Sequence, residues 1–266
     1  MPEAAASSPL GDSAKDAMPT MGFLDHLEEL RKRIIYSVMA IVIGFFGCWF
    51  AKQRLVDIMQ KPIVEVLRQS HLPEKLVYQH PVDPFNLYVK VAGVAGLFVV
   101  SPFVLYQIWL FIAPGLYRHE KRYVLPFMLS TVSLFLAGGY FAYRIVLPNA
   151  LTVLIGFGKP FLPMITIEEY TSLFVTIIVG IGIIFEMPVL VFFLALMGIV
   201  SAGWMWRNIR YSILGIFIVA AIIAPPDIVN MCIFAAPMLV LYVLSIGVAW
   251  FVHPAQRKKR ADKNAS

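Results

Sequence analysis

Six apolar runs constrain this chain more than any other feature of its sequence. A helix of about 20 apolar residues crosses the roughly 30 Å hydrocarbon core of a membrane. Inside lipid, every backbone N–H and C=O group must be hydrogen bonded within the protein, so spans of this length form helices. The sequence therefore predicts an all-α, polytopic membrane protein with six transmembrane helices, in the runs 34–50, 91–113, 123–143, 173–200, 211–224 and 228–252.

The composition of the whole chain agrees with this interpretation. Hydrophobic residues make up 59% of the 266 positions and charged residues 14%, and the mean hydropathy is +0.77. Soluble domains average about 45 to 50% apolar and about 25% charged residues, so a soluble globular protein is excluded. The formal net charge of +6 is expected of a membrane protein with basic cytoplasmic loops, and it requires no nucleic-acid partner.

The distribution of Lys and Arg predicts the orientation of the chain. Most basic residues lie before the first run, in the loops after the second and fourth runs, and in the tail 254–266. Basic loops stay on the cytoplasmic side, so both termini are expected in the cytoplasm. Residues 1–20 are rich in Ala, Ser and Pro and predict a disordered N-terminal tail. Residues 21–253 form the predicted membrane domain, and 254–266 a basic cytoplasmic tail.

Two of the six runs have unusual lengths. The fifth, 211–224, covers only about 21 Å at about 1.5 Å per residue, so it cannot cross an undistorted bilayer. Either the membrane thins there or the turn that follows lies below the far surface. The fourth run, 173–200, is longer than a span needs, so it is expected to tilt or to kink near Pro188.

The segment 23–33 carries apolar residues on one face and charges elsewhere, which predicts a short amphipathic helix leading into the first run. Glu29 lies four residues before Arg33, as Glu28 does before Lys32. Two interpretations of these acids remain open. They pair with the bases along the helix surface, worth about 0.2 to 0.5 kcal/mol per pair, or they are available to an incoming cation.

Three further acids are candidate functional residues. Glu120 lies in a short basic loop, where it either compensates local charge or binds a guanidinium group. Glu186 lies in the middle of the fourth run, where a carboxylate is costly and faces a structural partner, the bundle interior or water. Asp227 follows two prolines and either caps the next helix or serves a functional role.

No catalytic or metal-binding motif is present in the sequence. Cys48 and Cys232 lie in apolar runs without Cys-x-x-Cys spacing, and neither a GxSxG nor an HExxH motif occurs. We therefore expect no enzymatic activity, cofactor or metal. The main alternative function is a solute or proton-coupled transporter using Glu186, but internal repeat symmetry is missing. An intramembrane protease is disfavoured, because the spans hold no Ser/His or paired Asp arrangement.

Five sequence motifs occur in a characteristic order. They are HLEELRKR at 26–33, SPFVLYQIW at 101–109, FIAPGLYRHEKR at 111–122, FEMP at 185–188 and PPD at 225–227. In their order, their spacing and their positions on six apolar runs, they resemble the TatC family, the core subunits of the twin-arginine protein translocase. The resemblance covers residues 21–253, and the combination of motifs is specific to this family.

The resemblance implies a receptor for folded precursor proteins whose signal peptides carry paired arginines before an apolar stretch. Glu29 and Glu120 match the family's cytoplasmic acids that contact the arginine pair, and Phe111 lies beside that site. Arg31 and Arg33 match the basic part of the same N-terminal motif. The expected signal-peptide-binding residues are therefore Glu29, Glu120, Phe111, Arg31 and Arg33.

The resemblance also implies partners and a location. Glu186 matches the intramembrane acid on the concave side of a cupped bundle, where with Asp227 it would dock the single-span partners TatA and TatB. We also expect contacts with membrane lipid, a homo-oligomer within the receptor complex, dependence on the proton-motive force, and location in a bacterial or archaeal plasma membrane. Two positions depart from the family pattern: Ala224 replaces a common Thr and Met231 a common polar residue. Both weaken the inferred docking cluster, although Asn230 is a possible substitute.

Overall fold

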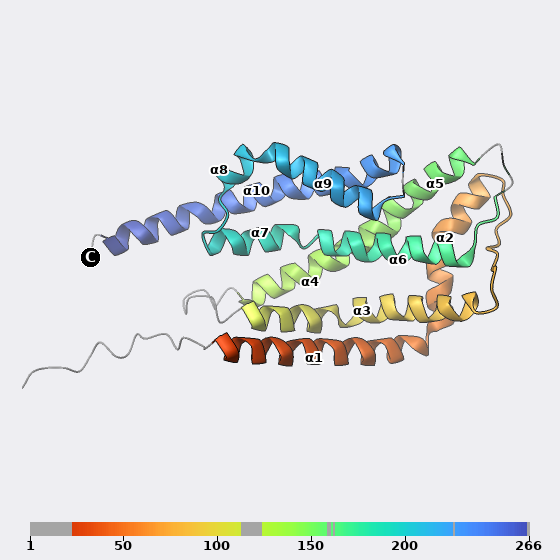
Figure 1. The fold of residues 1–266 in the computed structure, drawn as a ribbon, viewed down its shortest axis with the longest axis horizontal. Coiled ribbons are helices and arrows are strands. Elements are labelled where there is room, and N and C mark those ends of the chain that lie inside the picture. Colours follow the sequence, from red (N-terminus) through yellow and green to blue (C-terminus); the bar gives the residue numbers. More distant parts are fainter. Residues whose placement is uncertain (1–22, 113–123, 159–160, 162, 226, 265–266) are drawn as a thin grey trace, which may run out of the picture.

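Long apolar helices dominate the computed structural model, which describes residues 23–112, 124–158, 161, 163–225 and 227–264. Within these described ranges, five segments are long and apolar enough to cross a membrane, and they run roughly along the long axis of the molecule (Figure 1). These segments are Leu27–Trp49, Asp83–Phe111, Met128–Phe157, Ile167–Leu196 and Ile228–Trp250. The described residues contain no strand, and the predicted all-α, polytopic fold class is confirmed.

Some of these segments are single helices and others are interrupted. The single helices are α1 (Phe23–Trp49), α3 (Asp83–Ile112) and α10 (Ile228–Asn264). The third segment consists of α4 (Val124–Phe141), the π-helical turn η3 (Ala142–Val146) and α5 (Leu147–Phe157). The fourth consists of α6 (Ile167–Ile184) and α7 (Met187–Leu196).

A shorter apolar helix, α9 (Ile209–Ile223), corresponds to the predicted fifth span. Its 15 residues extend about 22 Å at the usual rise of an α-helix, less than the hydrocarbon thickness. The short helix α8 (Ala202–Arg207) precedes it. The count of six spans, the cupped shape and the cytoplasmic position of both termini remain predictions.

The fourth span is broken where the sequence predicted a kink. α6 ends at Ile184, α7 begins at Met187, and Pro188 occupies the first turn of α7. Proline is tolerated there because a first-turn N–H has no partner within the helix. The break places Glu186 at a helix end instead of inside a continuous helix.

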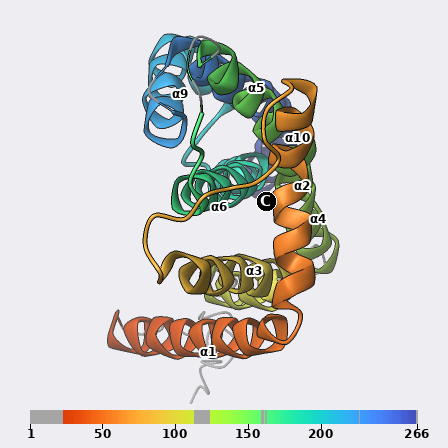
Figure 2. The same ribbon diagram turned by 90° about the vertical axis from the view of Figure 1, so that its right-hand side faces the viewer.

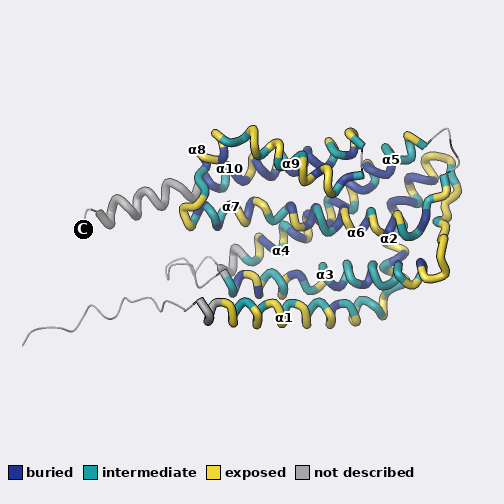
Figure 3. The backbone as a smooth tube through the Cα atoms, in the orientation of Figure 1, coloured by how far each residue is buried: buried dark blue, intermediate teal, exposed yellow. Residues whose placement is uncertain are grey.

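The predicted amphipathic segment 23–33 is not a separate helix, because it continues without a break into the rest of α1. α1 packs against α3 through two glycines. A Cβ atom added at Gly96 would lie 2.7 Å from the backbone nitrogen of Phe45, and one added at Gly44 would lie 2.9 Å from the carbonyl oxygen of Gly96. The two backbones therefore touch, and much of the remaining surface of α1 is exposed at the edge of the molecule (Figure 3).

An amphipathic helix, α2 (Lys52–Gln69), follows α1 and was not predicted from the sequence. It lies across the end of the bundle that is remote from the N-terminus of α1 (Figure 1). Its buried face includes Met59 and Ile63, both in the main core. Charged residues interrupt its apolar pattern, so no long apolar run marks it in the sequence.

Two tyrosines from the spans hold α2 in place. Pro62 has no N–H group to donate to the carbonyl of Ile58, four residues earlier in the helix. The hydroxyl of Tyr143, in η3, donates to that carbonyl at 2.7 Å. The hydroxyl of Tyr170, in α6, donates to the next carbonyl, that of Met59. These contacts connect the surface helix to the third and fourth spans.

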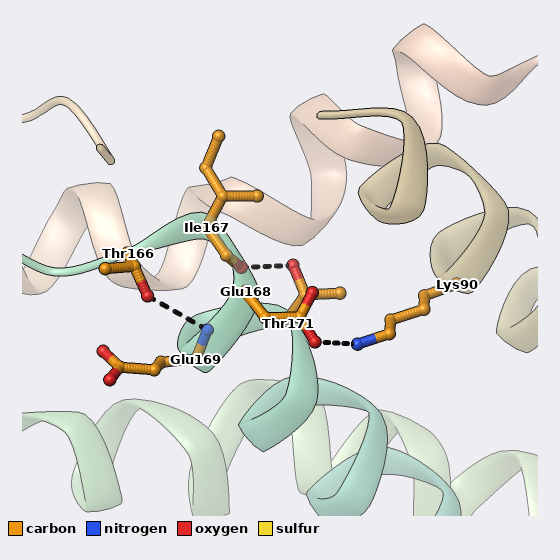
Figure 4. A network of polar contacts seen from close by, with 6 residues as sticks. All are labelled: Lys90, Thr166, Ile167, Glu168, Glu169 and Thr171. Carbon is orange, nitrogen blue, oxygen red and sulfur yellow. Dashed lines mark hydrogen bonds and ion pairs between the residues drawn. The ribbon is translucent and has the colours of Figure 1, made fainter. Parts of the chain in front are cut away.

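A polar network joins α3 to the start of α6 at the same end of the bundle (Figure 4). The N–H group of Glu169 donates to the hydroxyl of Thr166 at 3.2 Å, which caps α6. Lys90 of α3 forms an ion pair with Glu168 in the first turn of α6. A β-bridge joins Val77 to Thr166. The loops at this end are therefore connected by several independent contacts.

Candidate functional site

Arg33 is the centre of a polar cluster between α1 and α3. Its guanidinium group donates to Oε1 of Glu29, one turn earlier on α1, at 3.1 Å. It also donates to Oε1 of Gln107, on α3, at 3.2 Å. We call these three residues, Glu29, Arg33 and Gln107, the α1–α3 polar cluster. The predicted pairing of Glu29 with Arg33 is thus observed, with a third member from another helix.

The cluster is largely shielded from solvent, and its hydrogen bonding is incomplete. The side chains of Glu29 and Arg33 are only 16% and 24% exposed to solvent, and Gln107 is buried. Among the described residues, Oε2 of Glu29 has no hydrogen-bond partner, and neither has Nε of Arg33. An unpaired buried acceptor costs about 1 to 3 kcal/mol, and more when it is charged. Oε2 of Glu29 therefore has hydrogen-bonding capacity that no described residue uses.

The other predicted binding residues have different surroundings. Phe111 is half-buried in the last turn of α3, four residues after Gln107 and so on the same helix face. Arg31 is exposed, whereas Arg33 is half-buried. The two arginines predicted as one group therefore differ, because only Arg33 belongs to the α1–α3 polar cluster.

Glu120, the second predicted acid, lies outside the described residues. The helices on either side of its loop are α3 and α4. The end of α3 and the start of α4 lie at the same end of the bundle as the start of α1 (Figure 1). The segment 113–123, which contains Glu120, joins these two helix ends in the sequence.

Trp109 fixes this end of α3 to two other helices. Its indole Nε1 lies 3.4 Å from the hydroxyl of Thr131 on α4, to which it donates. Its ring centroid lies 4.1 Å from that of Phe193 on α7. With Val189 and Phe193, it forms a small apolar cluster separate from the main core. Gln107 and Phe111 flank Trp109 and are therefore presented from a braced helix.

Glu186 lies in the break between α6 and α7. Its N–H group donates to the carbonyl of Ile183 at 3.0 Å, and its carbonyl accepts from Leu190 at 2.9 Å. The carboxyl group is half-buried, and its Oε1 has no hydrogen-bond partner among the described residues. The adjacent ring of Phe185 packs on Gly138 of α4, where a Cβ atom would lie 2.7 Å from Cγ of the ring. The break thus presents a carboxylate with an unused oxygen.

Asp227 caps the start of α10. Its Oδ1 accepts from the N–H group of Asn230 and its Oδ2 from the side-chain amide of the same residue, both at 2.7 Å. The helix-cap interpretation of Asp227 is confirmed. The Asn230 side chain is fully buried, and its Oδ1 has no partner in the part of the chain that the structure describes. The unused oxygen at this turn therefore belongs to Asn230.

The fold and the site together define a class of protein. In the described ranges, no three His, Cys, Asp or Glu side chains gather as metal ligands would. The candidate groups are instead single carboxylates at a helix end and at a helix break, on an all-α polytopic bundle. Charged groups on a polytopic helical bundle commonly mark transport pathways, so this arrangement is that of a membrane transport protein.

The family follows from comparison with known proteins. Residues 25–237 match the family described as Sec-independent protein translocase protein (TatC). This chain belongs to the TatC family and is a non-enzymatic component of the Sec-independent protein translocase. The family resemblance stated from the sequence motifs is thereby confirmed.

Similar proteins cover nearly the whole chain. The "Sec-independent protein translocase protein TatC" of Koribacter versatilis is 64% identical over 250 residues, which are 94% of this chain and 92% of that protein. The TatC protein of Helicobacter pylori strain J99 is 38% identical over 89% of this chain and 92% of its own length. A crystal structure described as "Twin Arginine Translocase Receptor- TatC" matches with a TM-score of 0.76 and 34% identity, and it covers 85% of this chain and 99% of its own.

Gln107 is the functional candidate that the sequence prediction missed. The sequence prediction includes Gln107 only as part of a family motif, because a neutral amide adds nothing to the charge pattern. Its partner Arg33 is 74 positions away, so no local spacing connects them. The available signal was a polar amide inside the apolar run 91–113.

Proposed function

We propose that this chain is the receptor for twin-arginine signal peptides and the core scaffold of the translocase that exports folded precursor proteins. The observation that carries the proposal is the unused Oε2 of Glu29 in the half-buried α1–α3 polar cluster. The description of the similar crystal structure as a twin-arginine translocase receptor supports it. Glu120, Phe111 and Arg31 complete the proposed binding site.

An incoming guanidinium group binds Glu29 beside Arg33 without displacing it. Arg33 stays on Oε1, because Gln107 holds its other terminal nitrogen. The signal arginine then donates to Oε2. A planar guanidinium offers paired N–H donors to a carboxylate, which an ammonium group cannot do, so the site prefers arginine to lysine.

The apolar part of the signal peptide provides most of the affinity. In a shielded site such as this one, the cost of desolvating both charges offsets much of their attraction, so one ion pair is too little to hold a precursor. Burial of apolar surface contributes about 25 cal/mol per Å². The acids therefore determine selectivity, while contacts with the apolar stretch determine binding strength.

The proposal extends to partners and location. Glu186 meets polar groups of the single-span partners TatA and TatB at the helix break. Asp227 contributes by orienting Asn230, whose Oδ1 is unused among the described residues. The chain acts as a homo-oligomer in the bacterial or archaeal plasma membrane, with both termini in the cytoplasm, and the proton-motive force drives transport.

Photo-crosslinking of a twin-arginine signal peptide in native membranes tests the receptor role. We expect crosslinks to the wild-type chain that become weaker with a twin-lysine peptide, and with the Glu29→Gln plus Glu120→Gln variant. Glu28→Gln is the matched control, because Glu28 is exposed on the same helix. If crosslinks are equally strong in all variants, or absent in membranes that hold intact protein, the proposal is wrong.

A further inference from the structure

A polar recess of about 640 Å³ lies between α2 and the segment formed by η3 and α5. Its charged lining consists of Lys61, Glu65 and Arg68 from α2 and Arg144 from η3. α2 lies across the end of the bundle, next to the third span (Figure 2), and the apolar run predicted for that span, 123–143, ends just before Arg144. On that prediction, the recess opens where the third span leaves the hydrocarbon core. This is the depth at which lipid headgroups lie.

Three of the four charges are available to a ligand. Arg68 donates two hydrogen bonds to Glu74, at 2.9 and 2.8 Å, and these hold the pKa of the Glu74 carboxyl group below its ordinary value. Arg68 is therefore engaged. Lys61, Glu65 and Arg144 form no ion pair within the described part of the chain. The recess thus combines two available cations with one available carboxylate.

The position of Arg144 is unusual for a charged residue. It lies inside the apolar segment Met128–Phe157, and charges in such segments commonly mark functional sites. Its backbone is part of the π-helical turn η3, a geometry that also recurs at functional sites. The preceding residue, Tyr143, is hydrogen bonded to the carbonyl of Ile58 in α2, which holds Arg144 beside that helix.

We propose that this recess binds the headgroup of a membrane phospholipid that carries a phosphate and a primary ammonium group. The phosphate accepts hydrogen bonds from Arg144 and Lys61, whereas the ammonium group donates to Glu65. Charge complementarity favours such a headgroup over inorganic phosphate, because phosphate alone leaves Glu65 unpaired and close to a like charge. A headgroup that lacks an amine leaves the same carboxylate unpaired.

Native mass spectrometry of the purified full-length chain tests this site by titration with phosphatidylethanolamine, phosphatidylglycerol or inorganic phosphate. We expect the Lys61→Gln plus Arg144→Gln variant to bind phosphatidylethanolamine about tenfold or more weakly, because it loses two charge-assisted hydrogen bonds. Arg54→Gln, an exposed change on the same helix outside the recess, should stay within about twofold. Glu65→Gln should abolish the preference for phosphatidylethanolamine over phosphatidylglycerol.

Three results would overturn the proposal. Unchanged lipid affinity in the double variant would show that the recess is not the site. Equal binding of both lipids to the wild-type chain would remove the role of Glu65. Displacement of the lipid by an equal concentration of inorganic phosphate would show an anion site instead of a lipid site. If the double variant does not remain monodisperse, the single variant Lys61→Gln replaces it, because Lys61 is exposed. Its affinity for phosphatidylethanolamine is then compared with that of the wild-type chain.

Discussion

At the scale of single residues, the α1–α3 polar cluster depends on a neutral side chain. Gln107 is buried, and its Oε1 accepts one hydrogen bond from Arg33. This bond keeps one terminal nitrogen of Arg33 away from Glu29, and Oε2 of Glu29 has no partner among the described residues. The availability of the carboxylate to a signal arginine is therefore set by an amide on another helix.

Replacing Gln107 by methionine tests this dependence. Gln107→Met keeps the size of the side chain but removes the acceptor, so both terminal nitrogens of Arg33 can turn to Glu29. We expect crosslinking of a twin-arginine peptide to fall several-fold, and the free energy of unfolding to fall by about 1 kcal/mol. Gln53→Met, at an exposed position on α2, is the control. If Gln107→Met crosslinks to the peptide as strongly as the wild-type chain does, Gln107 does not control the availability of Glu29.

At the scale of helices, two local features determine how neighbours pack. One is the close approach of α1 and α3 at Gly44 and Gly96, where a Cβ atom would meet backbone atoms that cannot move aside. The other is the carbonyl of Ile58, which Pro62 leaves without a partner in the helix and which Tyr143 hydrogen bonds. Each feature predicts a selective effect of one substitution.

Gly96→Ala is expected to separate α1 from α3. The added methyl group would lie 2.7 Å from the backbone nitrogen of Phe45, which we expect to cost about 1 to 3 kcal/mol as overpacking does. Gly93→Ala, one turn earlier in α3, has no neighbouring atom within 4 Å and should be neutral or slightly stabilising. Thermal unfolding in detergent measures both. Equal Tm values for the two variants would contradict the close contact.

A double-mutant cycle tests how Tyr143 holds α2. Tyr143→Phe leaves the carbonyl of Ile58 without its donor, at an expected cost of about 1 kcal/mol. In a Pro62→Ala background the helix regains an N–H group for that carbonyl, so the same substitution should cost less. The coupling is read from thermal unfolding of the four chains. A cost of Tyr143→Phe that is independent of residue 62 would exclude this explanation.

At the scale of the whole molecule, the sequence predicted the spans better than their connections. Apolar runs marked the spans, and Pro188 marked the break at Glu186, because both effects act locally. α2 escaped prediction, since the charged residues of its exposed face leave no long apolar run in the sequence. The π-helical turn at Arg144 left no trace in the pattern. For the site, the pairing of Glu29 with Arg33 was foreseeable from helix spacing, whereas Gln107 required knowledge of which helices touch.

Cysteine labelling tests the predicted six crossings. Single cysteines at Ser8, Ser70 and Lys263 are introduced into a chain lacking Cys48 and Cys232. A membrane-impermeant maleimide should label only Ser70→Cys in intact cells, and the other two after permeabilisation, because an even number of crossings keeps both termini inside. Labelling of Lys263→Cys in intact cells would show an odd number of crossings, with α9 as the helix that does not cross.

The most direct test of the central claim is the affinity of purified protein for twin-arginine and twin-lysine signal peptides, measured with Glu29 and with Glu29→Gln. Our account predicts that the wild-type chain binds the twin-arginine peptide more tightly than the twin-lysine peptide, and that this preference largely disappears in Glu29→Gln. The affinity for the twin-lysine peptide should change little, because the apolar stretch provides most of the binding energy. Glu28→Gln should retain the preference. An arginine preference that persists undiminished in Glu29→Gln would contradict the account.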